Sequence, residues 1–166
     1  MIVDAETAAE FSQIAHKGQT RWDGSDYFEN HVQQIVDMMR EDLGPRDIVD
    51  DGETVMGAQV DVVLDRFYQV AYLHDVIEDT QYTREDLYRA GFTPMVVQAV
   101  EAISKISDSR EDYWEYIGRV KVNSIATVVK VYDIQNNLQD IMDNYPEKTD
   151  KIKKYETALS ILMAAV

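Results

Sequence analysis

Apolar residues recur every three or four positions along most of the chain, which is the period of an α-helix with one buried face. Glycine, proline and aspartate gather between these stretches, chiefly over residues 17–25, 44–57 and 90–94, and they indicate turns and loops. The pattern predicts helices over residues 4–17, 27–43, 59–77, 83–88, 95–104, 111–120, 124–142 and 146–165. We therefore predict an all-α fold.

Cap residues and apolar stripes support these helices. Asp4, Thr83 and either Asn123 or Ser124 have the side chains that cap helix N-termini. The expected stripe of the first helix is Ala8, Phe11, Ile14 and Ala15, and that of the second is Val32, Ile35, Val36 and Met39. The β-branched run over residues 125–133 leaves one alternative open, because its propensity alone also suits a strand.

Length and composition place limits on the function. A chain of 166 residues with 45% apolar residues predicts one globular domain over residues 1–166. The sequence has no membrane-length apolar run and no signal-peptide pattern, so we expect a cytoplasmic protein. The absence of cysteine excludes disulfides, iron–sulfur clusters and thiolate zinc sites. A net charge of −15 repels nucleic-acid backbones and anionic membranes, so we expect neither as a partner. A small anionic substrate would need a local positive site, and the sequence leaves the oligomeric state open.

The third predicted helix carries four ionisable residues within an apolar run. Glu78 lies four residues after His74 and three after Asp75, and Asp79 lies four after Asp75. The four residues, His74, Asp75, Glu78 and Asp79, would therefore form one polar strip on a continuous helix. Carboxylates packed this closely repel one another unless a cation or a proton intervenes. A divalent metal ion is the simplest cation, and the alternative is a helix end that emerges into solvent.

A second apolar helix is interrupted in the same way. Asp133 and Asn137 lie one turn apart, with Lys130 one turn before them, and His31 lies near the buried face of another helix. Taken alone, His31 is also consistent with a hydrogen-bonded core histidine. Solvent exposure does not readily explain polar groups that point inward from two separate helices. We therefore predict that one metal ion binds between these groups and neutralises them. Its predicted ligands are His31, His74, Asp75 and Asp133.

The order H…HD…D resembles the signature of HD-domain metal-dependent phosphohydrolases. Over about residues 8–138, the chain resembles the alarmone (ppGpp) hydrolase domain of RelA/SpoT-type proteins. Five segments carry this resemblance: "AHKGQTRWDGSDYFENHV", "VAYLHDVIEDT", "TREDL", "AISK" and "VVKVYDIQNN". The resemblance implies a single HD-domain helical bundle that binds one Mn²⁺ ion and removes the 3′-pyrophosphate of guanosine tetra- or pentaphosphate. It implies a stand-alone small or phage-type form of that domain.

The resemblance also implies roles for individual residues. The four predicted ligands match the ligands of the family, and Glu78 and Asp79 match the acidic pair that orients or deprotonates the attacking water. Arg21 and Asn137 match positions on the substrate side. Lys17, Arg21 and Lys130 are candidate cations for phosphate. The alternatives are an exposed helix-end lysine for Lys17 and a structural partner of a buried acid for Lys130.

The chain departs from the family pattern after its last predicted ligand. Ile134 and Asn136 stand where the family commonly has Arg and His in "DRLHN", and the segment between His31 and His74 carries an additional loop over residues 44–57. Two other functions therefore stay open. One is an HD phosphohydrolase acting on a nucleoside triphosphate or a dinucleotide messenger, and the other is a non-catalytic nucleotide-binding module.

Overall fold

The computed structural model describes residues 3–43, 49–50, 53–54, 57–105 and 110–166. Its elements, in chain order, are α1 (Ala5–Ala15), the π-helical segment η1 (Phe28–Val32), α2 (Gln33–Asp42), β1 (Val49–Asp50), β2 (Glu53–Thr54), α3 (Gly57–Leu73), α4 (Val76–Asp79), α5 (Arg84–Ala90), α6 (Pro94–Ile103), α7 (Tyr113–Lys121), α8 (Ser124–Asn144) and α9 (Thr149–Met163). β1 and β2 form a short antiparallel pair inside the segment expected to be a loop, and the remainder of that segment, residues 44–48, 51–52 and 55–56, lies outside the described residues. The all-α prediction is confirmed.

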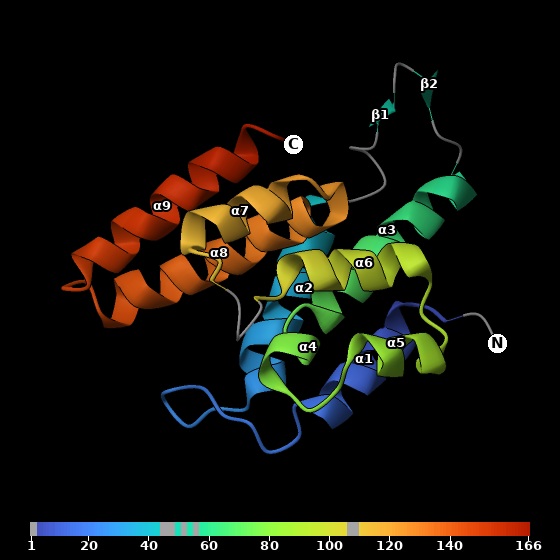
Figure 1. The fold of residues 1–166 in the computed structure, drawn as a ribbon, viewed down its shortest axis with the longest axis horizontal. Coiled ribbons are helices and arrows are strands. Elements are labelled where there is room, and N and C mark those ends of the chain that lie inside the picture. The colour runs from blue at the N-terminus through green and yellow to red at the C-terminus, as the bar shows by residue number, and fades with distance from the viewer. Residues whose placement is uncertain (1–2, 44–48, 51–52, 55–56, 106–109) are drawn as a thin grey trace.

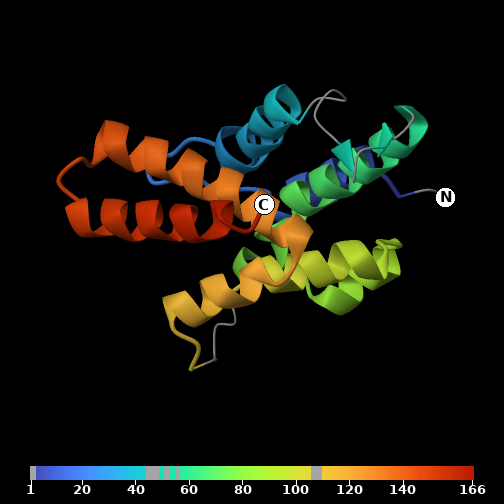
Figure 2. The same ribbon diagram turned by 90° about the horizontal axis from the view of Figure 1, so that it is seen from above.

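Helix α8 runs through the middle of the bundle (Figures 1 and 2). It packs against α2, α3, α6, α7 and α9, and α9 lies antiparallel beside it. Its buried residues are Ile125, Ala126, Thr127, Val129, Lys130, Val131, Tyr132, Asp133, Ile134 and Ile141. A helix surrounded in this way needs apolar side chains on several faces, which explains the β-branched run that strand propensity also fitted. The helical alternative for this run is therefore correct.

The predicted caps form the expected hydrogen bonds. The Asp4 carboxylate accepts from the N–H of Thr7, and the Asn123 side chain accepts from the N–H of Ala126. Thr83 and Asp86 cap each other's backbone N–H at the start of α5, and the helix ends at Gly91, which has a φ of 96°. Local sequence thus sets where these helices begin and end.

The apolar stripe of α1 differs from the prediction at Ile14, whose side chain is 65% exposed. The buried face instead follows Ala5, Ala8 and Ser12. These small residues let α1 lie close to α3, and the backbone N–H of Ala5 donates to the Asp65 carboxylate across this contact at 2.8 Å. The predicted stripe of the second helix is confirmed, since all four residues are buried.

The helix predicted over residues 59–77 is interrupted at His74 and Asp75, where α3 ends and a turn leads into α4. His74 Nδ1 lies 2.7 Å from the carbonyl oxygen of Ala71. In a continuous helix that carbonyl would accept from the N–H of Asp75 instead. The prediction of one unbroken helix was wrong, and the break occurs at two of the predicted ligands.

Candidate metal centre

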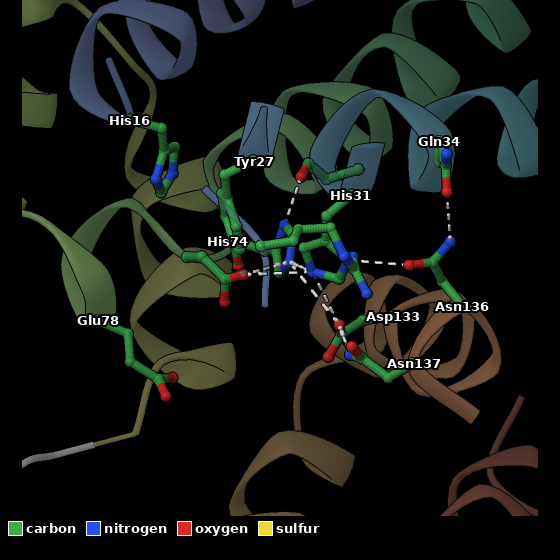
Figure 3. Close-up of polar contacts among 12 residues, drawn as sticks. His16, Tyr27, His31, Gln34, His74, Glu78, Asp133, Asn136 and Asn137 are labelled. Atoms are coloured by element: carbon green, nitrogen blue, oxygen red, sulfur yellow. Dashed lines mark hydrogen bonds and ion pairs between the residues drawn. The ribbon is translucent and has the colours of Figure 1, made fainter. Parts of the chain in front are cut away.

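Two imidazoles meet inside the bundle. His31 belongs to η1, and His74 follows the last residue of α3 (Figure 3). Both side chains are buried, and their Nε2 atoms lie 3.4 Å apart. Extra residues in a π-helical segment shift side chains relative to a regular helix and often occur at functional sites. The local backbone at both histidines therefore departs from a continuous α-helix.

Two carboxylates approach the same point from different elements. Asp75 Oδ2 lies 2.9 Å from His74 Nε2 and 3.5 Å from His31 Nε2. Asp133 Oδ1, from α8, lies 3.4 Å from His31 Nε2 and 3.9 Å from His74 Nε2. The ligand atoms of His31, His74 and Asp133 all fall within 4.8 Å of one another. Two imidazoles and two carboxylates form a donor set that suits a divalent transition-metal ion, so these residues fit the predicted metal.

The charges within this group are strongly coupled. Burial by itself would lower the pKa of His31, but hydrogen bonds and charge from Asp133 and Asp75 outweigh burial and raise that pKa to about 10. The pKa of His74 is also raised, because the Asp75 carboxylate overcomes the effect of burial. Burial would raise the pKa of both Asp75 and Asp133, yet the neighbouring cations hold both below the usual range. The two carboxylates therefore favour positive charge at the point where they meet the imidazoles.

Asp133 has partners one turn away on either side along α8. The buried Lys130 ammonium lies 2.6 Å from Asp133 Oδ2, and Asn137 Nδ2 donates to Oδ1 at 2.6 Å. The Tyr116 ring lies under Lys130, with 5.3 Å from Nζ to the ring centroid. This geometry matches the alternative in which Lys130 is the structural partner of a buried acid.

The acidic pair Glu78 and Asp79 lies on α4, just beyond the break. Both Glu78 oxygens face Lys105, from which they accept at 2.9 Å (backbone N–H) and 3.0 Å (Nζ). Partial burial, followed by the charges of Asp75 and Glu78, raises the pKa of Asp79 to about 6. The carbonyl of Asp79 accepts from Gln19 Nε2 at 2.8 Å, which ties α4 to the loop after α1. The pKa of Asp79 is thus shifted towards neutral pH.

A cavity of about 480 Å³ opens in front of the metal centre. Five cationic residues line it: Arg21, Lys105, Lys130, Lys148 and Lys151. Aromatic residues also line it: Trp22, Tyr27, Tyr113, Tyr145 and Tyr155. The predicted acids Asp75, Glu78, Asp79 and Asp133 also line it, together with a fifth acid, Asp140, and with His31, Thr20 and Asn137. The five acids of the lining match the five cations in number, and Arg21, Lys105 and Lys130 each pair with one of them. Positive charge for an anionic substrate would therefore come from a bound metal ion together with Lys148 and Lys151.

Arg21 is fixed at the edge of the cavity by a tight loop. Its guanidinium lies 2.9 Å from Asp140 Oδ2 and donates to the Asn30 carbonyl at 3.2 Å. Gly24, with a φ of 84°, makes the turn, and the backbone bridge between Thr20 and Asp26 closes the loop. Trp22 Nε1 donates to the same Asp140 oxygen at 3.0 Å, and the Trp22 ring packs edge-on against Tyr145 at 4.9 Å.

The structure does not bring every predicted site residue to the cavity. Lys17 is exposed after the end of α1 and is absent from the described lining, whereas Lys130 and Arg21 belong to it. Sequence reasoning also missed Lys105, Lys148, Lys151 and Asp140. Lys148 and Lys151 come from the last helical segment, and nothing in their local pattern links them to residues one hundred positions earlier.

Comparisons with known proteins bear on the family resemblance and on the fold. No protein-family model matches the chain. The guanosine-3′,5′-bis(diphosphate) 3′-pyrophosphohydrolase of Vibrio cholerae serotype O1 is 29% identical over 151 residues, which cover 84% of this chain and 18% of that enzyme. The solved structure of a metazoan ortholog of SpoT that hydrolyses ppGpp superposes with a TM-score of 0.68 at 19% identity, covering 95% of this chain and 84% of the other.

These matches confirm the resemblance to ppGpp hydrolases and the fold, a helical bundle of the HD-domain type. The chain spans only 18% of the length of the curated relative. Within the described residues, no helix is both long and apolar enough to cross a membrane.

Proposed function

We propose that this chain is a metal-dependent phosphohydrolase that removes pyrophosphate from a guanosine tetraphosphate-like alarmone. The observation that carries the proposal is the convergence of His31, His74, Asp75 and Asp133 beside a cavity whose lining includes five Lys and Arg residues. The similarity to the Vibrio cholerae enzyme and to the metazoan SpoT ortholog supports the choice of substrate.

The four residues would hold one divalent ion. The donor set suits Mn²⁺, Fe²⁺, Co²⁺, Ni²⁺ or Zn²⁺, and we propose Mn²⁺ on the resemblance to alarmone hydrolases. A bound divalent ion lowers the pKa of water and stabilises negative charge on a phosphoryl oxygen. Tyr27 donates a hydrogen bond to Asp75 Oδ2, and Lys130 and Asn137 hold Asp133, so both carboxylates have fixed orientations.

Asp79 and Glu78 would handle the attacking water. A pKa of about 6 leaves Asp79 mostly ionised at neutral pH but able to accept a proton. Lys105 holds Glu78 in place and lies on the cavity wall, so it also adds positive charge near the reacting phosphate. We assign proton transfer to Asp79 and orientation of the water to Glu78.

The remaining cations would bind the phosphates. Arg21 is held rigidly, and a guanidinium binds phosphate in a planar bidentate manner. Among the described residues, no carboxylate lies within ion-pairing distance of Lys148 or Lys151, so both remain available to an anion. The Trp22 and Tyr145 rings offer apolar surface for a base. Lys17 lies outside this arrangement.

The test is a nucleotide panel incubated with the metal-free protein and with protein supplied with Mn²⁺. We expect guanosine tetraphosphate to yield guanosine diphosphate and pyrophosphate. Anion-exchange chromatography separates and identifies these products. Cleavage of triphosphates alone would favour the other HD phosphohydrolase function. Binding without cleavage under every metal tested would favour the nucleotide-binding module.

A further inference from the structure

One neighbour of the metal centre has no role in the scheme above. Asn136, on α8, places Oδ1 2.9 Å from His31 Nδ1 (Figure 3). Its Nδ2 donates to Gln34 Oε1 on α2 at 3.1 Å. The chain of contacts from Gln34 through Asn136 to His31 therefore links α2, α8 and η1, and neither Gln34 nor Asn136 belongs to the described lining of the cavity.

The contacts of these atoms make Nδ1 of His31 a hydrogen-bond donor. Asn136 turns its amide NH₂ towards the Gln34 oxygen, so its own oxygen faces the imidazole. A carbonyl oxygen only accepts, so Nδ1 must be the donor. Nε2 is the atom that lies 3.4 Å from Asp133 Oδ1 and 3.5 Å from Asp75 Oδ2. The amide thus holds the tautomer in which Nε2 is directed at the metal centre.

His74 has an equivalent arrangement built from the main chain. Its Nδ1 lies 2.7 Å from the Ala71 carbonyl oxygen, and its Nε2 points to the same centre. Both imidazoles therefore have Nδ1 bound to an oxygen acceptor and Nε2 directed inward. For His74 the acceptor is fixed by the backbone, whereas for His31 it is a replaceable side chain.

We propose that Asn136 is a positioning residue that orients His31 for metal binding, an inference that rests on the metal site of the proposed function. Asn136 is one of the two departures from the "DRLHN" pattern, so this chain supplies the acceptor with an amide. The Oδ1 acceptor suits both the protonated ring and a metal-bound ring, because Nδ1 keeps its hydrogen in each. The ring need not turn when a metal ion replaces the proton on Nε2.

The first experiment measures the Mn²⁺ affinity of metal-free protein from the electron paramagnetic resonance signal of free Mn²⁺. Asn136→Leu removes the acceptor at similar volume and should weaken binding about 10- to 100-fold, the usual cost of losing such a partner. Asn136→Asp keeps the acceptor and should bind at least as tightly as wild type. Gln139→Leu removes another amide of α8, one that contacts Asp143 and does not touch His31, and should leave the affinity unchanged.

The second experiment reads the tautomer directly in wild-type protein, which keeps the test independent of how the variants fold. In ¹⁵N-histidine NMR spectra of the Zn²⁺-loaded protein, His31 should show a protonated Nδ1 and a metal-bound Nε2. A His31 protonated at Nε2 would overturn the proposal, as would wild-type Mn²⁺ affinity in folded Asn136→Leu. If wild-type protein bound no divalent ion, the proposed function would fail together with this inference.

Discussion

Helices α3 and α8 both bring predicted ligands to the metal centre, but α3 ends where its ligands begin and α8 continues through its own. His74 and Asp75 are adjacent in the sequence, and successive residues on a helix point about 100° apart. His74 and Asp75 can both face the metal centre because the helix stops at Leu73, just before them. Asp133 is a single ligand, so a regular helix suffices to present it.

The two helices also stabilise their ligands in different ways. On α8, Lys130 and Asn137 contact Asp133 from one turn before and one turn after, which is the contact geometry of a regular helix. Beyond the end of α3, the two ligands differ: His74 Nδ1 contacts the Ala71 carbonyl of α3 itself, whereas Asp75 accepts from Tyr27 of another segment. Local contacts of a helix can thus support one ligand, as they do for Asp133 and for His74, whereas the second of two adjacent ligands, Asp75, depends on a tertiary contact.

The largest expected effect is on the α8 side. Asp133→Ala should abolish metal binding and lower the free energy of unfolding by about 3–5 kcal/mol, because it leaves the Lys130 ammonium buried without its partner. Urea denaturation of the metal-free protein measures the stability. The double variant Lys130→Met, Asp133→Leu should recover most of the stability but no metal binding. An unchanged unfolding midpoint in Asp133→Ala would contradict the supporting role of Lys130.

The next effect concerns the acids beyond the break. Asp79→Asn and Glu78→Gln should each reduce turnover about 10²-fold or more, the usual scale for a positioned acid or base, while Mn²⁺ affinity stays near wild type. Steady-state rates and metal titrations on the same samples separate the two properties. Glu85→Gln, on the exposed face of α5, is the matched control. Normal turnover in both cavity variants would require another group to activate the water.

A pH profile sharpens the assignment of Asp79. Its pKa of about 6 lies above the ordinary value of 3.8, so the carboxylate needed as a base is lost as pH falls through about 6. Turnover should therefore rise with pH through this region. The same shift means that ionised Asp79 disfavours folding above its pKa, so Asp79→Asn should be more stable than wild type at pH 8. An unchanged acidic limb in this variant would assign the titration to a different group.

The smallest expected effect tests whether α8 depends on its own cap. Asn123→Ala removes the side-chain acceptor for the Ala126 N–H and should lower the free energy of unfolding by about 1 kcal/mol. Metal affinity should not change, since the cap lies more than two turns from Asp133. Thermal and urea unfolding measure the loss. A marked drop in metal affinity would show that the α8 ligand is less locally supported than the comparison implies.

Much of the fold and part of the candidate site could be predicted from the sequence. The caps at Asp4, Thr83 and Asn123 and the apolar stripe of α2 are local features, and they form as predicted. The predicted ligands lie together, although their role in metal binding stays a prediction. The break after Leu73 could not be read from periodicity, because the apolar pattern continues through Val76 and Ile77.

The sequence by itself determined the helical pattern, the helix starts and the order of ligand-type residues, because these depend on contacts between residues three or four apart. Tertiary structure alone decided which face of α1 is buried, which lysines of α9 reach the cavity and which oxygen meets His31 Nδ1. Asn136 illustrates the reason: its partners Gln34 and His31 lie more than one hundred positions away. Such contacts arise only when the helices pack, and helical periodicity carries no information about them.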